Sequence, residues 1–137
     1  LSGYFADESA IARSVPPIEK FLGEMADKSG AKNLYVVGHS MGTRGLTQAL
    51  KNLLAKRPEL RGRFRGIILA APDIDAKVFR EQLAPSMGLA SGRVTLYSSS
   101  QDLALKASKQ VNRGPRAGDS SEGVLLVGGV DTIDVSR

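Results

Sequence analysis

The stretch Asn-Leu-Tyr-Val-Val-Gly-His-Ser-Met-Gly-Thr-Arg-Gly-Leu-Thr-Gln-Ala-Leu, residues 33–50, decides the fold of this chain. Its first part, residues 33–38, is continuously apolar, as is typical of a strand buried on both faces of a parallel sheet. From Met41 onward leucines recur at helical spacing, which predicts a helix that ends before Pro58. The sequence Gly38-His-Ser-Met-Gly42 joins the two and places a serine on the turn between strand and helix.

The segments around this stretch continue the alternation of strands and helices. Pro16-Pro17 is predicted to open an amphipathic helix that stops at Gly30. Beyond residue 50 the pattern predicts strands at 64–71, 93–98 and 130–135, helices after Asp75 and through 103–111, and a loop at 112–123. Such alternation predicts an α/β fold, with a mainly parallel sheet flanked by helices on both faces. The length of 137 residues fits one domain.

The composition excludes several kinds of chemistry. The chain has no cysteine and one histidine, His39. Disulfides, thiolate metal sites and a cysteine nucleophile are therefore excluded, and a histidine-based metal site nearly so. We expect no metal and no organic cofactor. No apolar run approaches 18 residues and no signal peptide is visible, so the sequence contains no recognisable membrane span and leaves the compartment open.

The net charge of +5 raises the question of an anionic partner. Much of the excess lies between Lys51 and Arg65, where Phe64 is the one aromatic residue. A platform for stacking nucleic-acid bases needs several aromatic side chains, so we expect no nucleic-acid partner. The plainer interpretation is a solvated helix end, and contact with an acidic membrane surface is a third, less supported hypothesis.

The turn at Ser40 has the pattern Gly-x-Ser-x-Gly between a strand and a helix. On a sharp, strained turn a serine projects its hydroxyl away from the sheet. We expect Gly38 and Gly42 to be required because a Cβ at either position would clash with neighbouring backbone. The amide of Met41 then points toward the reaction centre at a helix N-terminus and forms half of an oxyanion hole. The alternative is a glycine-rich cap with Ser40 as an ordinary N-cap residue.

Two strand ends carry candidate acids. Asp102 follows the predicted strand at 93–98 and is the preferred acid, because nucleophile, acid and base follow one another in that order in the usual hydrolase layout. Asp73 is the reserve candidate, and either aspartate could instead cap its following helix; for Asp75 the cap is preferred. His39 adjoins Ser40 and cannot fold back onto it, so it is interpreted as a packing or hydrogen-bonding residue and not as the base.

These residues resemble a known family. Gly-His-Ser-Met-Gly at 38–42, Leu-Ala-Ala-Pro-Asp-Ile-Asp at 69–75 and Val-Thr-Leu-Tyr-Ser-Ser-Ser-Gln-Asp-Leu-Ala-Leu at 94–105 are similar to segments of largely uncharacterised bacterial esterase- or lipase-like α/β-hydrolases. The resemblance spans nearly the whole chain. It implies Ser40 as nucleophile, Met41 as oxyanion donor and Asp102 as acid.

In that family the catalytic histidine follows the last strand, and no histidine follows position 39 here. The resemblance therefore implies that residues 1–137 form one incomplete domain holding the middle and C-terminal strands, inactive by itself. The leading hypothesis is a serine hydrolase that acts on small carboxylic esters through an acyl-enzyme. The alternative is a non-catalytic binding or scaffold domain of the same fold. The sequence leaves acyl and alcohol specificity and the oligomeric state open.

Overall fold

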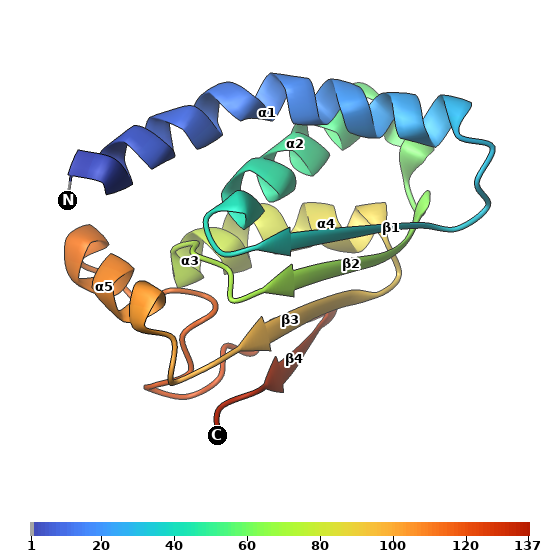
Figure 1. The fold of residues 1–137 in the computed structure, drawn as a ribbon. Coiled ribbons are helices and arrows are strands. Elements are labelled where there is room, and N and C mark those ends of the chain that lie inside the picture. Colours follow the sequence, from blue (N-terminus) through green and yellow to red (C-terminus); the bar gives the residue numbers. More distant parts are fainter. Residues whose placement is uncertain (1) are drawn as a thin grey trace.

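The computed structural model describes residues 2–137 and shows an α/β arrangement (Figure 1). Four strands form one sheet, and helices precede and connect them. The elements in chain order are α1 (Ser2–Lys28), β1 (Leu34–His39), α2 (Gly42–Lys56), the 3-10 turn η1 (Pro58–Leu60), β2 (Phe64–Ala70), α3 (Ala76–Val78), the π-helical turn η2 (Phe79–Leu83), α4 (Ala84–Ala90), β3 (Val94–Ser98), α5 (Leu103–Asn112) and β4 (Val130–Asp134).

The sheet is parallel throughout, with the strand order β1-β2-β3-β4. One transverse row of paired residues runs across all four strands: His39, Ala70, Tyr97 and Ile133. The carboxyl ends of the strands therefore lie at one edge of the sheet, which is the edge where parallel α/β proteins place their sites. The predicted parallel α/β architecture is confirmed.

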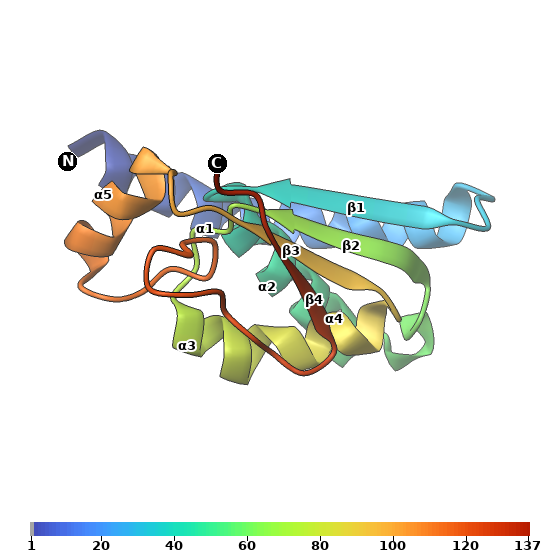
Figure 2. The same cartoon turned by 90° about the horizontal axis from the view of Figure 1, so that it is seen from below.

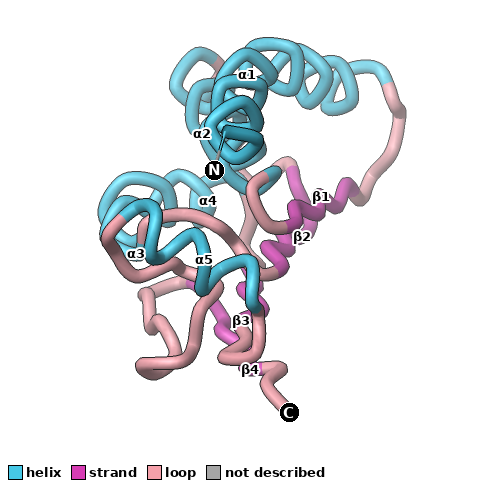
Figure 3. Tube along the Cα trace, turned by 60° about the vertical axis from the view of Figure 1, so that its left-hand side comes forward, coloured by secondary structure: helices cyan, strands magenta, loops and turns pink. Residues whose placement is uncertain are grey.

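Within residues 2–137 helices α1, α2 and α4 lie on one side of the sheet, and not on both as the sequence pattern predicted (Figures 2 and 3). Helix α5 lies beyond the carboxyl ends of the strands (Figure 1). The other face is open, since Tyr35 is 62% exposed and Val37 is 67% exposed. The expectation that β1 is buried on both faces is wrong for these residues. The reason is topological: right-handed crossovers that always step to the next strand in the same direction bring every connecting helix to the same side.

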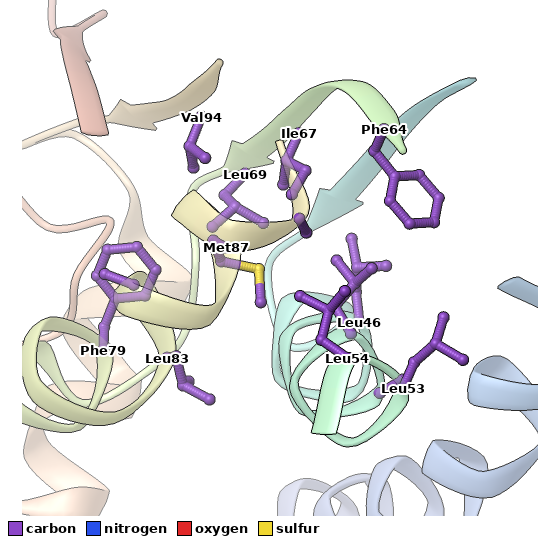
Figure 4. Packing of buried hydrophobic residues seen from close by; sticks show 14 of the residues in the cluster. Leu46, Leu53, Leu54, Phe64, Ile67, Leu69, Phe79, Leu83, Met87 and Val94 are labelled. Atoms are coloured by element: carbon purple, nitrogen blue, oxygen red, sulfur yellow. The ribbon is translucent and has the colours of Figure 1, made fainter. Parts of the chain in front are cut away.

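The hydrophobic core lies between this covered face and the helices α2 and α4 (Figure 4). Strand β2 contributes Ile67 and Leu69, which both face the helices because side chains alternate along a strand. It also contributes Phe64, which precedes an irregularity in the pairing with β1. The core residues with 2% exposure or less include Ala49, Leu50, Phe64, Ile67, Leu69, Phe79, Met87, Ala90, Val94 and Leu96. This packing holds the carboxyl ends of β1, β2 and β3 together.

Helix α1 begins well before the position predicted for it. It runs from Ser2 to Lys28 and passes through Pro16 and Pro17, which the sequence pattern had placed at its start. Its inner face packs along α2, where Ile11 and Ile18 lie against Gly45. The tertiary contact outweighs the two backbone hydrogen bonds that prolines remove. No helix among residues 2–137 is both long and apolar enough to cross a membrane.

The basic stretch between Lys51 and Arg65 is partly used inside the fold. Arg57 makes a two-pronged ion pair with Asp27 of α1, and Lys56 pairs with Glu19. Arg63 donates to the carbonyl oxygens of Ala26 and Ala31. These contacts tie α1 to the segment between α2 and β2, so the stretch has a structural role beyond a solvated helix end.

Candidate active site

Ser40 lies on the turn between β1 and α2 in a left-handed backbone conformation, with φ of 51°. Such a conformation costs a non-glycine residue about 1–2 kcal/mol and persists where the surroundings impose it. The Ser40 amide donates to the Ala70 carbonyl at 2.9 Å. Its carbonyl accepts from the Thr43 hydroxyl at 2.6 Å and from the Thr43 amide at 3.2 Å. The turn is thus the sharp strand-to-helix elbow that the sequence pattern predicts.

The amide of Met41 stands at the start of α2. Met41 is the helix N-cap residue, with φ of −61° and ψ of −28°. No backbone atom of residues 2–137 accepts a hydrogen bond from its amide. An amide at this position can donate to a developing oxyanion, and the helix dipole adds to its attraction for negative charge.

The two glycines of the elbow have different roles. A Cβ at Gly38 would lie 2.9 Å from Leu46 Cδ2 and 3.2 Å from Thr43 Cγ2, so a larger residue there would require these side chains of α2 to move. The close contacts are with side chains and not with backbone as predicted, since the nearest backbone atom, Thr43 Cα, lies at 3.4 Å. At Gly42 a Cβ would meet nothing within 4 Å. The predicted steric need for glycine at position 42 is therefore wrong within the described chain, because this first residue of α2 faces open space.

Asp102 lies four residues beyond the end of β3 and is the N-cap of α5. One carboxylate oxygen accepts from the Leu105 amide at 3.0 Å. The capping role that the sequence left open is thus present. The carboxyl ends of β1 and β3 flank the end of β2, so Ser40 and Asp102 lie at the same edge of the sheet. The second oxygen can orient an imidazole while the first caps the helix.

Asp73, the reserve acid, is buried at the end of β2 with 3% of its surface exposed. One carboxylate oxygen accepts from Arg116 Nε at 2.8 Å and from the Ser108 hydroxyl at 2.5 Å. The other accepts from the Tyr4 hydroxyl at 3.1 Å and lies 3.0 Å from Arg44 Nη2. The carboxylate thus accepts three hydrogen bonds and makes an ion pair with Arg44. Asp73 is therefore the centre of a structural network formed by α1, α2, α5 and the loop after α5.

The network determines the charge state of Asp73. Burial by itself raises the pKa of this carboxyl group, because it disfavours the charged form. The hydrogen bond from Ser108 and the positive charges of Arg44 and Arg116 outweigh burial, and the pKa is lowered below the usual 3.8. The Asp73 carboxylate is therefore ionised at neutral pH.

The sequence predicts neither a base at His39 nor a bound metal ion. His39 is the last residue of β1 and is exposed. From the sequence it is interpreted as a packing or hydrogen-bonding residue, and its exposure contradicts the packing role within the described residues. Among residues 2–137, no group of three or more acidic or histidine side chains is placed to hold a metal ion.

Sequence reasoning missed the partners of Asp73. Tyr4, Arg44, Ser108 and Arg116 come from four separate segments, and no motif links them. Asp75 was correctly assigned as the cap of the following helix, since its carboxylate accepts from the amides at 77 and 78, each at 2.9 Å. The one signal that could have marked Asp73 is its place next to a buried Pro72 at a strand end.

A strained serine on the turn between a strand and a helix of a parallel sheet is characteristic of the α/β-hydrolase class. Residues 1–136 match the family described as Alpha/beta hydrolase of unknown function (DUF900). The chain belongs to this family. Comparisons with curated proteins and with solved structures gave no match.

The lowered pKa of Asp73 predicts a pH-dependent stability. Its ionised form stabilises the fold above the unfolded-state pKa near 4, and this contribution is lost as the pH falls through the lower pKa of the folded state. We expect Asp73→Asn to melt well below the wild type at pH 7. The difference should shrink as the pH falls below about 4, because the unfolded wild type then binds a proton that the folded state takes up only at lower pH. Melting temperatures of both proteins from pH 7 to pH 3 check this, and a constant difference would contradict it.

Proposed function

We propose that this protein is a serine hydrolase that cleaves small carboxylic esters through an acyl-enzyme on Ser40. The observation that carries the proposal is the left-handed Ser40, with φ of 51°, between β1 and α2. Strain of this kind at a non-glycine residue is characteristic of functional positions. The neighbouring Met41 amide at the start of α2 supports the same interpretation.

The proposed reaction has two halves. Ser40 Oγ attacks the ester carbonyl carbon while a general base takes the hydroxyl proton, and the Met41 amide stabilises the resulting oxyanion. The tetrahedral intermediate collapses, the alcohol leaves with the proton returned by the base, and the acyl group stays on Ser40. Water, activated by the same base, then releases the carboxylic acid. Asp102 orients the base in this proposal.

The base is the part that residues 1–137 do not supply, since their one histidine is His39. We therefore assign proton transfer to a histidine outside these residues. The same observation favours the second candidate function, a non-catalytic domain of this fold that serves in binding. The two candidates differ in whether Ser40 is a reactive nucleophile.

The experiment that separates them is covalent labelling of the protein, as its gene encodes it, with a fluorophosphonate. Trypsin releases residues 33–44, a peptide in which Ser40 is the one serine. We expect the adduct on this peptide by mass spectrometry, and an initial burst with a p-nitrophenyl ester. A folded protein that gains no adduct there would support the binding domain instead. Labelling the 137-residue chain separately tests the expectation that it is inactive by itself.

A further inference from the structure

Ser40 is not the only strained residue at this edge of the sheet. Ala71, just beyond the end of β2, also adopts a left-handed conformation, with φ of 45°. Two adjacent strands therefore both turn sharply at the same level. Because non-glycine residues do not hold this conformation without support, the contacts around them must impose it.

The contacts on Ser40 show where the support comes from. Of the groups that donate to its carbonyl, two belong to Thr43, which lies on the same turn. The third is the Asp73 amide, at 3.2 Å, and it comes from the end of the neighbouring strand. The Asp73 amide is thus the link between the serine turn and the end of β2.

The position of that amide is set by the charged side chains around Asp73. The carboxylate is held by Arg116 and Ser108 on one oxygen and by Tyr4 and Arg44 on the other. The Asp73 carbonyl also accepts from Arg44 Nε at 2.5 Å and from Arg116 Nη2 at 3.2 Å. Side chain and backbone of one residue are therefore fixed by the same two arginines.

Arg44 adds a second link, because it lies on the first turn of α2, directly after the elbow. Its contacts with Asp73 connect the start of that helix to the end of β2. Glu8 of α1 pairs with the same guanidinium. Moving Asp73 would therefore displace both the carbonyl of Ser40 and the helix end that carries the Met41 amide.

We propose that Asp73 is a positioning residue for Ser40: its carboxylate anchors the segment after β2, so that the Asp73 amide and Arg44 hold the elbow in its strained conformation. This inference rests on the proposed function of Ser40. It gives Asp73 a role other than the triad acid, since the buried carboxylate is already engaged by three hydrogen bonds and by the ion pair with Arg44.

The test compares Asp73→Asn and Asp73→Ala with Asp75→Ala in the protein as its gene encodes it. Asp75 is the matched control, because it is an aspartate two residues away that caps α3. Ser108→Ala is the milder variant, since it removes one hydrogen bond to Asp73 and leaves the ion pairs of Asp73 with Arg44 and Arg116 in place. The measurements are kcat and KM for a p-nitrophenyl ester, the rate of fluorophosphonate labelling, the melting temperature and hydrogen exchange of the amide at position 73.

We expect Asp73→Asn to lower kcat and the labelling rate by about 100-fold, the cost of misplacing a reacting group by about 1 Å, with KM within twofold. Ser108→Ala should lower them less, and Asp75→Ala should lower the melting temperature while kcat stays within twofold. The amide at position 73 should lose protection in Asp73→Asn. If Asp73→Ala does not fold, Asp73→Asn and Ser108→Ala carry the comparison.

Two results would overturn the inference. One is a folded Asp73→Asn protein with wild-type kcat. The other is a loss of about 10⁴-fold in Asp73→Asn with little loss in Asp102→Asn, which would make Asp73 the triad acid. If the wild type itself shows no reaction at Ser40, the proposed function fails. Hydrogen exchange of the amide at position 73 then tests the anchoring role of the Asp73 carboxylate separately. Unchanged protection of this amide in Asp73→Asn contradicts that role, and lost protection supports it.

Discussion

Ser40→Ala is expected to reduce ester hydrolysis by the protein, as its gene encodes it, by about 10⁴- to 10⁶-fold. The substitution removes the oxygen that forms the acyl-enzyme and leaves the Met41 amide in place. What remains is binding and oxyanion stabilisation without a nucleophile. The measurement is kcat for a p-nitrophenyl ester, together with loss of the fluorophosphonate adduct from residues 33–44.

The matched control is Ser29→Ala. Ser29 follows α1 near the amino end of β1, at the sheet edge opposite Ser40, and its hydroxyl accepts from the Ala31 amide. The chemical change is the same as in Ser40→Ala, but it lies at the opposite edge of the sheet. We therefore expect kcat to stay within about twofold of the wild type. Because alanine also occupies the left-handed position at 40 with strain similar to serine, the melting temperature should change little. Activity that survives in Ser40→Ala would refute the acyl-enzyme on this residue.

Gly118→Ala is expected to destabilise the fold by about 3 kcal/mol, the upper end for added volume in a packed site. A Cβ at this position would lie 2.6 Å from both the Ala71 carbonyl carbon and the Pro72 nitrogen. These are backbone atoms and cannot rotate away as the end of a side chain can. Gly118 also donates to the Pro72 carbonyl at 3.0 Å and accepts from the Ser99 amide at 2.9 Å.

The Gly118→Ala substitution is also expected to disturb the candidate active site. Gly118 joins the segment before Asp73 to the segment before Asp102, so forcing it outward moves both strand ends. Urea unfolding measures the stability loss, and the labelling rate at Ser40 measures the effect on the site. Gly88→Ala is the control, because a Cβ there meets nothing within 4 Å and alanine favours helix α4. Equal urea midpoints for Gly118→Ala and the wild type would contradict the prediction.

Much of the site was visible in the sequence because its information is local. The apolar run before Gly38, the serine on the turn and the leucines of α2 lie within 18 consecutive residues, 33–50. Backbone geometry links these positions directly, so spacing alone predicts strand, turn and helix. Asp75 as a helix cap is local for the same reason.

The predictions that the structure contradicts concern residues whose surroundings are formed by segments distant in the sequence. Helix α1 continues through Pro16 and Pro17 because α2 provides a surface for its inner face. Gly42 has open space around it, and this depends on which elements pass near the start of α2. Asp73 is an unremarkable acidic residue in the sequence, and its role follows from Tyr4 and Arg116, which lie 69 and 43 residues away.

By itself, the sequence determined the parallel α/β architecture, the elbow at Ser40 and the end of the sheet at which the candidate site lies. These follow from residue patterns at spacings of two to four positions, which backbone geometry converts directly into strands, turns and helices. Only the tertiary structure decided that the helices cover one face, that Gly118 touches the backbone of Ala71, and that Asp73 is surrounded by two arginines. Such contacts join residues far apart in the chain, and they form only when the packing of the whole sheet brings its strand ends together.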